Sequence, residues 1–144
     1  MLFRSLGKTR HKFIVSKGPQ ASEFELASNM MGAEFLPQIS IIPKVDLVIT
    51  HGGNNTTTES VHFGKPMIVL PLFWDQYDNA QRVHEIGHGI RLATYHFKDE
   101  ELTNAIEKLT TDTALLAKLS KIGEQVRSRK GIEEAATKIE ALAK

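Results

Sequence analysis

Short apolar runs alternate with amphipathic segments along the first two thirds of the chain. The runs predict five β-strands, at Lys12–Ser16, Met30–Phe35, Asp46–Thr50, Met67–Leu70 and Gly89–Leu92. The intervening pattern predicts helices at Asn55–Phe63 and Asp78–Ile86. Strands too apolar to face water, separated by helices, are typical of a parallel sheet covered on both faces. The sequence therefore predicts an α/β fold, a Rossmann-like parallel sheet with flanking helices.

The last third of the chain has a helical pattern throughout. Apolar residues at three- to four-residue spacing predict helices at Asp99–Leu109, Thr113–Arg127 and Ile132–Ala143. Turn residues separate these helices. No repeat, low-complexity tract or linker interrupts the sequence, so we expect one domain over residues 1–144.

The beginning of the chain, Leu2–Lys8, is typical of the end of a helix. A doubly wound fold normally opens with a strand and its glycine-rich turn. We therefore expect that the first strand is missing, or that the backbone groups at the edge of the sheet find hydrogen-bond partners in another way. Because that strand would be central, the sheet would need a partner.

Composition narrows the class of partner. The formal net charge of +1 gives no electrostatic reason for binding nucleic acid or an anionic membrane. The apolar stretch Met67–Trp74 is far shorter than the ~20 residues that span a bilayer, and the start of the chain has no signal-peptide pattern. The absence of cysteine excludes disulfides and thiolate metal sites. We expect a cytoplasmic protein without a membrane span or a metal.

The segment Thr50–Glu59, Thr-His-Gly-Gly-Asn-Asn-Thr-Thr-Thr-Glu, follows a predicted buried strand. It predicts a tight glycine turn into a helix N-terminus, where free backbone N–H groups and the positive dipole end favour phosphate. Glu59 lies about one helical turn further in, where a carboxylate can accept hydrogen bonds from sugar hydroxyls. The segment therefore predicts a site for a nucleotide that carries a sugar.

Each residue also has a simpler interpretation when it is taken alone. The pair Gly52-Gly53 can be an ordinary turn. Thr56 and Asp75 can be helix caps, and Phe35 can be a core residue.

Four motifs occur in order along the chain: Phe-Leu-Pro-Gln from Phe35, His-Gly-Gly-x-Asn-Thr-x-x-Glu from His51, Gly-Lys-Pro-Met from Gly64 and Asp-Gln-x-x-Asn-Ala from Asp75. Together they resemble the donor-binding motif of the UDP-glycosyltransferases. These are inverting enzymes of the GT-B fold that move a sugar from a UDP-sugar to small acceptors. The resemblance implies that the chain is the C-terminal, donor-binding domain of such an enzyme.

The resemblance also implies roles in binding the nucleoside. Phe35 stands where the family usually has tryptophan, and its ring would stack on uracil, since an aromatic face binds a base with little polarity cost. Gln38 would contact the uridine near the ribose. Glu59 would bind the ribose hydroxyls.

The remaining roles concern the diphosphate and the sugar. By resemblance the diphosphate would be bound by His51, Gly53, Asn55 and Thr56, through side chains and backbone N–H groups. Asp75 and Gln76 would hold hydroxyls of the transferred sugar, because paired carboxylate and amide groups distinguish hydroxyl orientation. Neither a metal nor another cofactor is implied, since the UDP-sugar is a substrate.

In the family, a general base deprotonates the acceptor hydroxyl and UDP leaves with inversion. The catalytic histidine and its aspartate partner belong to an N-terminal acceptor-binding domain that residues 1–144 do not contain. We therefore expect no catalytic residue in this chain and little turnover by the chain alone. The expected partners are a UDP-sugar and that domain, or a separate acceptor-binding subunit.

Two other interpretations stay open. The first is a natural half-enzyme that resembles the split N-acetylglucosaminyltransferase of lipid-linked oligosaccharide synthesis, although that motif usually lacks the pair Asp75-Gln76. The second is a non-catalytic nucleotide-binding module. No Gly-x-Gly-x-x-Gly follows a first strand, which disfavours an NAD site.

Overall fold

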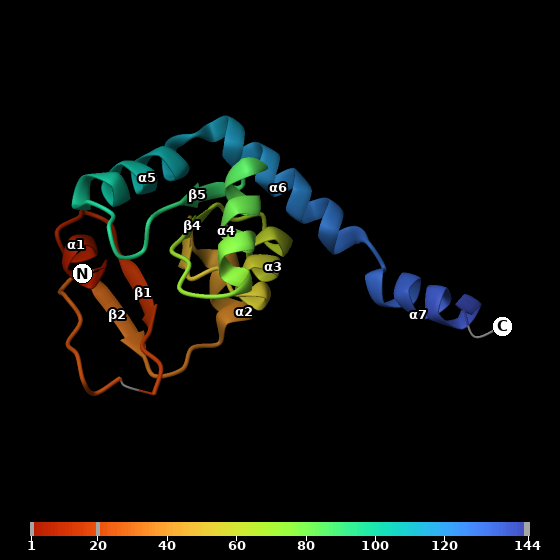
Figure 1. The fold of residues 1–144 in the computed structure, drawn as a ribbon, viewed down its shortest axis with the longest axis horizontal. Coiled ribbons are helices and arrows are strands. Elements are labelled where there is room, and N and C mark those ends of the chain that lie inside the picture. Colours follow the sequence, from red (N-terminus) through yellow and green to blue (C-terminus); the bar gives the residue numbers. More distant parts are fainter. Residues whose placement is uncertain (1, 20, 143–144) are drawn as a thin grey trace.

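The computed structural model describes residues 2–19 and 21–142 and confirms the α/β architecture (Figure 1). The strands are β1 (Phe13–Ser16), β2 (Met30–Ala33), β3 (Val48–Thr50), β4 (Met67–Val69) and β5 (Gly89–Arg91). All their pairings are parallel. β1 pairs with β2, whereas β3, β4 and β5 form a second sheet with β4 in the middle. In the described residues the predicted sheet is therefore divided into two half-sheets, with no ladder joining β1 to β3.

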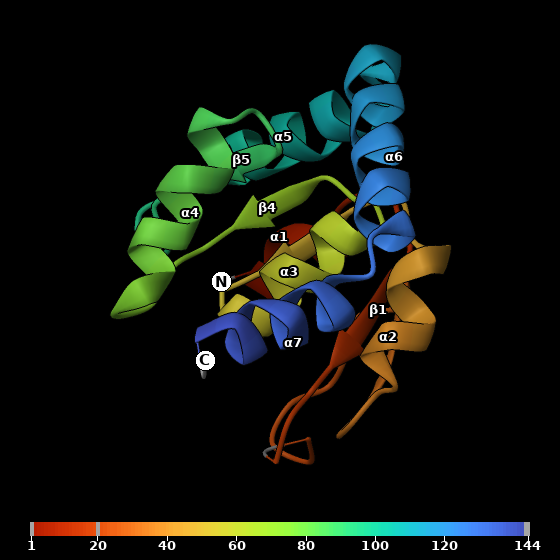
Figure 2. The same cartoon turned by 90° about the vertical axis from the view of Figure 1, so that its right-hand side faces the viewer.

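The helices flank these half-sheets. They are α1 (Leu2–Gly7), α2 (Gln38–Ile41), α3 (Asn54–His62), α4 (Asp75–Glu85), α5 (Asp99–Thr111), α6 (Thr113–Ser128) and α7 (Gly131–Leu142), with a 3-10 turn, η1 (Ile42–Lys44), after α2. Figure 2 shows β4 between α5 and α3.

The core is built on β4, whose residues are fully buried. Successive side chains of a strand point to opposite faces. Ile68 packs in one cluster with Ile106 of α5 and Leu6 of α1. Met67 and Val69 pack in a second cluster with residues of α4. Both faces of the central strand are thus covered, as the continuous apolar run predicts.

Polar side chains also join α5 to α1 and to the segment that leads into β1. Ser5 Oγ and Lys8 Nζ donate hydrogen bonds to the carboxylate of Asp99, over 2.6 and 2.9 Å. These bonds lower the pKa of Asp99. A hydrogen bond between His11 and Glu107, at 3.0 Å, lowers the pKa of Glu107 in the same way. Because α5 also packs on β4, it fixes the position of α1 and β1 relative to the second sheet.

Some boundaries differ from the prediction. α4 begins at Asp75, so the predicted start at Asp78 is wrong. The side chain of Gln76 accepts hydrogen bonds from the backbone of the preceding loop, and these bonds favour the earlier start. α2 was not predicted, and β2 ends at Ala33 rather than at Phe35. The predicted end of the last helix, Ala143, lies outside the described residues.

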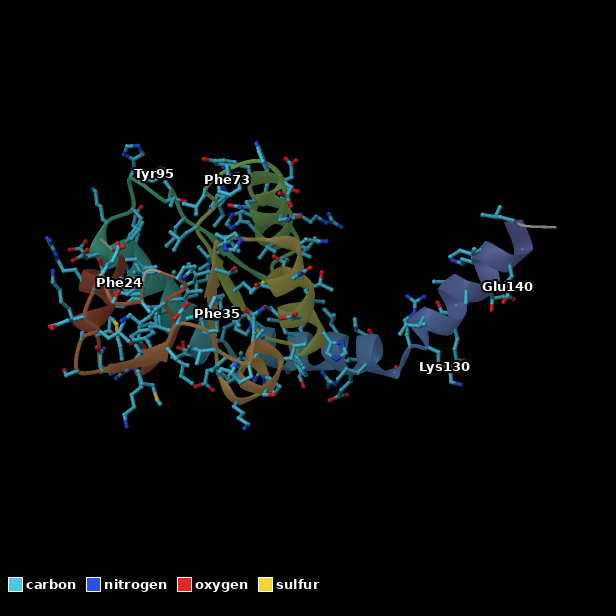
Figure 3. The ribbon with its side chains drawn as sticks, turned by 90° about the horizontal axis from the view of Figure 1, so that it is seen from below. Phe24, Phe35, Phe73, Tyr95, Lys130 and Glu140 are labelled. Carbon is cyan, nitrogen blue, oxygen red and sulfur yellow. The ribbon has the colours of Figure 1, made fainter. Side chains whose placement is uncertain are left out.

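α7 extends away from both sheets (Figures 1 and 3). All its described residues are exposed. No helix among residues 2–19 and 21–142 is long and apolar enough to cross a membrane.

Candidate functional site

The turn between β3 and α3 presents an open helix N-terminus. The backbone N–H of Gly52 donates to Thr50 Oγ1 over 3.2 Å, and Gly52 has a φ of 89°, which favours glycine. Gly53 is the N-cap of α3, and no side chain caps the helix. The first N–H groups of a helix have no partner within it. The turn therefore offers these N–H groups and the positive end of the helix dipole to an anion.

His51 stands over this helix end. Its side chain is exposed, and a Cβ added to Gly53 would lie only 2.5 Å from His51 Nε2. The imidazole therefore occupies the space that any side chain at position 53 would need. A ring nitrogen and the helix N-terminus consequently lie side by side.

Gln38, Thr56 and Glu59 form one hydrogen-bonded cluster. Gln38 Nε2 donates to Thr56 Oγ1 over 3.1 Å and to Glu59 Oε2 over 2.5 Å. Gln38, Thr56 and His51 also line a common hollow of about 580 Å³. His51 and Glu59 thus lie at the same end of the sheet. The cluster places a carboxylate, a group that can accept hydrogen bonds from hydroxyls, near an uncapped helix N-terminus.

Asp75 and Gln76 begin α4, but their surroundings differ. Asp75 is exposed, whereas Gln76 is only 5% exposed. Gln76 Oε1 accepts hydrogen bonds from the N–H groups of Leu72 and Phe73, over 2.9 and 3.2 Å. In this arrangement the amide oxygen of Gln76 holds the loop before α4, and the Asp75 carboxylate faces the solvent.

Asn79 connects this part of the site with the glycine turn. Its Nδ2 donates to Gly52 O over 2.9 Å and to Asp75 Oδ2 over 3.3 Å. Asn79 was not among the predicted site residues, although it is part of the Asp-Gln-x-x-Asn-Ala motif. The i, i+4 spacing of Asp75 and Asn79 on a helix was the signal that could have linked them.

Two exposed aromatic residues neighbour site residues in the sequence. Phe35 is 72% exposed on the segment between β2 and α2, three residues before Gln38 (Figure 3). Trp74, directly before Asp75, is 84% exposed and contacts Phe73 edge to face. Its φ of 51° is unusual for a residue other than glycine. Such backbone conformations cluster at functional sites.

The site thus combines an uncapped helix N-terminus, two carboxylates and exposed rings, at the carboxyl end of parallel strands. In the described part of the chain, no group of three His, Asp or Glu side chains could hold a metal ion. Open α/β sheets bind their ligands at this end of the strands.

Comparisons with known proteins define the class. The glycotransferase of kitacinnamycin superposes with a TM-score of 0.80 at 29% identity, over 90% of this chain and 34% of that one. The glycosyltransferase VinC, solved in complex with dTDP, superposes with a TM-score of 0.74 at 19% identity, over 88% of this chain and 32% of that one. The fold is that of the C-terminal part of a GT-B glycosyltransferase.

The chain belongs to the family described as erythromycin biosynthesis protein CIII-like, C-terminal domain, whose model matches residues 1–142. Among curated relatives it is similar to the NDP-glycosyltransferase YjiC of Bacillus subtilis (strain 168), with 32% identity over 126 residues. That match covers 88% of this chain and 32% of YjiC. The chain therefore spans about a third of the length of this relative.

Proposed function

We propose that this chain binds a UDP-sugar and positions it for transfer of the hexose to a small-molecule acceptor with inversion. One observation carries the proposal. The N-terminus of α3 is uncapped, His51 lies beside it, and the carboxylate of Glu59, further along the same helix, is held by Gln38. An anion with an attached sugar fits such an arrangement. The helix N-terminus attracts the anion, and the nearby carboxylate can accept hydrogen bonds from the sugar hydroxyls.

In this proposal the diphosphate lies on the α3 N-terminus. The N–H groups of Gly53 and Asn55, the Thr56 hydroxyl and the His51 ring donate hydrogen bonds to it. Charge that builds on the leaving diphosphate is then stabilised by donors already in place. Glu59 accepts hydrogen bonds from the ribose hydroxyls.

The other two parts of the donor lie at the rim. The ring of Phe35 stacks on the base, next to Gln38 at the ribose. The hexose hydroxyls meet the exposed carboxylate of Asp75, with Gln76 beside it. Asn79 holds both Asp75 and the glycine turn, so it maintains the spacing between the sugar and the diphosphate.

The general base comes from an acceptor-binding partner in this mechanism. The chain alone is then expected to bind donor without turnover.

Isothermal calorimetry with UDP, dTDP and ADP tests the proposal, and dTDP is included because VinC was solved with it. Measurable binding of UDP that is tighter than binding of ADP is the expected result. Equal affinity for UDP and ADP would indicate a general nucleotide-binding module, and no binding at millimolar ligand in a folded sample would refute the proposal.

Glu59→Ala is expected to weaken UDP binding by about 1–3 kcal/mol, because hydrogen bonds to a charged group are lost. This corresponds to a dissociation constant about 5- to 150-fold higher. Calorimetry on both proteins measures it. Glu100→Ala, which removes the same charge from an exposed position on α5, should leave the affinity unchanged. An unaltered dissociation constant in Glu59→Ala would remove Glu59 from the ribose role.

A further inference from the structure

A second hollow, separate from the candidate site, lies beside the edge strand β5. Its volume is about 610 Å³, which is within the range of small-molecule sites. Residues of α4 line it from one side, and residues 92–96, which follow β5, line it from the other. Of its described lining residues it shares only Thr94 with the hollow that His51 and Gln38 line. This second hollow, which we call the β5 hollow, is therefore a candidate for a different ligand.

One face of α4 supplies a wall of the β5 hollow. Tyr77, Gln81 and His84 line it, and their i, i+4, i+7 spacing places them on the same side of the helix. Gln81 Nε2 donates to Glu85 Oε1 over 2.8 Å, which leaves the amide oxygen of Gln81 for another partner. The wall thus offers a phenol ring, an amide oxygen and an imidazole.

Hydrogen bonds hold the opposite wall in place. Thr94 Oγ1 donates to Pro71 O over 2.5 Å, which ties the segment after β5 to the loop before α4. The backbone N–H groups of His96 and Phe97 both donate to Ala93 O over 2.9 Å, and Phe97 is buried in the core. Both walls are therefore fixed by contacts within the chain itself.

Arg91, the last residue of β5, contributes a charged group to this hollow. Its Nη1 donates to Gln81 Oε1 over 2.8 Å, and the carbon of its guanidinium lies 5.6 Å from the centre of the Tyr77 ring. A guanidinium has five N–H donors, so these contacts orient the group and leave most of its donors available. A donor group that is already oriented loses less entropy when a ligand binds.

The charge of Arg91 is not neutralised by a carboxylate. In the part of the chain that the structure describes, Arg91 forms no ion pair, whereas Arg10 lies 3.0 Å from the carboxylate of Glu107. The described residues that line the β5 hollow include no Asp or Glu. His84 and His96 line it as well, and their ring nitrogens can donate hydrogen bonds. The lining therefore favours an anion.

Two tyrosine rings line the same hollow with much of their surface exposed. Tyr77 is 42% exposed and Tyr95 is 67% exposed. Figure 3 shows Tyr95 on the same side of the molecule as Phe73, which lies in the loop before α4. Aromatic faces and edges pack well on another flat ring. The β5 hollow thus combines donors for an oxyanion with surfaces for a planar apolar group.

We propose that the β5 hollow binds a small molecule that carries a phosphate group on a planar ring. Arg91 donates to the phosphate as a bidentate partner, together with the imidazoles of His84 and His96. A phosphate monoester has three terminal oxygens, one for each of these donor groups, whereas a carboxylate has only two. The planar ring lies against Tyr77 and Tyr95. This site is additional to the donor site and does not rest on the proposed function.

Phenyl phosphate is the probe, and NMR on the isotope-labelled 144-residue chain locates its binding. We expect phenyl phosphate to shift the Nε–H signal of Arg91 and the backbone amides of Thr94 and Tyr95. Inorganic phosphate should bind at the same signals about threefold more weakly or worse, because it leaves the tyrosine rings uncovered. Phenol, which lacks the anion, should not shift them. If phenyl phosphate shifts only the amides of Gly53 and Asn55, the anion binds the N-terminus of α3 alone and the proposal is overturned. Equal affinity for phenyl phosphate and inorganic phosphate overturns it as well.

Two substitutions test the two halves of the hollow. Arg91→Gln should weaken phenyl phosphate binding about tenfold or more, because hydrogen bonds to a charged group are lost. Arg82→Gln removes the same charge from an exposed position on α4 that does not line the hollow, and it should leave the affinity nearly unchanged. Tyr95→Ala, at an exposed position, should weaken phenyl phosphate about two- to tenfold and leave inorganic phosphate unaffected. Thermal unfolding checks that the variants remain folded. Equal losses from Arg91→Gln and Arg82→Gln would show that only the overall charge matters, and the proposal would then be wrong.

A titration in the presence of saturating UDP separates this site from the donor site. The shifts of the Arg91 signal by phenyl phosphate should persist, because the two hollows have different linings. If UDP abolishes them, the β5 hollow is part of the donor site and the inference fails. If UDP binds and phenyl phosphate does not, the inference alone fails. If phenyl phosphate shifts the Arg91 signal and UDP does not bind, the proposed function alone fails.

Discussion

Gly53→Ala is expected to reduce UDP binding by about 1.5–3 kcal/mol, the range for hydrogen bonds to a charged group. The backbone of Gly53, with φ of −60° and ψ of 146°, suits alanine as well as glycine. The new methyl group, however, would lie 2.5 Å from His51 Nε2 and 3.3 Å from His51 Cε1. The imidazole must therefore leave the N-terminus of α3, and the diphosphate loses a donor.

A double-mutant cycle separates this mechanism from a direct effect of the methyl group. If Gly53→Ala acts through His51, it should cost little further affinity in a His51→Ala background. Asn54→Ala, at the next and exposed position, should bind UDP like the parent chain. Calorimetry gives the affinities, and thermal unfolding checks that all variants remain folded. Equal losses from Gly53→Ala in both backgrounds would show that His51 is not the cause.

The elements that could be predicted are those whose sequence pattern lies within a few consecutive residues. The run Met67–Leu70 is apolar throughout, and the corresponding strand β4 is buried on both faces. The start of α4 was predicted wrongly because it depends on the side chain of Gln76, which binds the loop before it, rather than on apolar periodicity. α2 is a single turn and too short to produce a periodic pattern.

The same distinction applies to the site. Thr50 to Glu59 are consecutive, so a turn and a helix N-terminus could be predicted from their order alone. The link from Asn79 to Gly52 spans 27 positions and becomes evident only when α4 packs beside the turn. The divided sheet has the same origin. The sequence predicted a missing first strand or an edge that is satisfied in another way, but it did not predict that Asp99 and Glu107 of α5 would bond to Ser5 and His11 and hold α1 and β1 beside the second sheet.

Gly64→Ala is expected to destabilise the chain by about 2–5 kcal/mol, from left-handed backbone strain and overpacking together. Gly64 ends α3 with a φ of 65°, and its N–H donates to Val61 O while Lys65 N donates to Ser60 O. This is the Schellman arrangement, in which glycine is favoured. A Cβ would also lie 2.6 Å from the backbone oxygen of Leu119, on α6. Backbone atoms cannot rotate away as a side chain can.

The chain contains a matched control at the end of α4. Gly87 has a φ of 69° and the same pair of hydrogen bonds, from Gly87 N to His84 O and from His88 N to Val83 O. The nearest atom to a Cβ there would be Lys118 Nζ, at 4.0 Å, which is an ordinary van der Waals contact. Gly87→Ala should therefore cost only the backbone strain, about 1–2 kcal/mol. Urea unfolding measures both variants. The difference between the two losses in unfolding free energy measures the close packing of α6 against the end of α3. This packing holds the helix whose N-terminus forms the site. Equal losses would show that the packing contributes nothing.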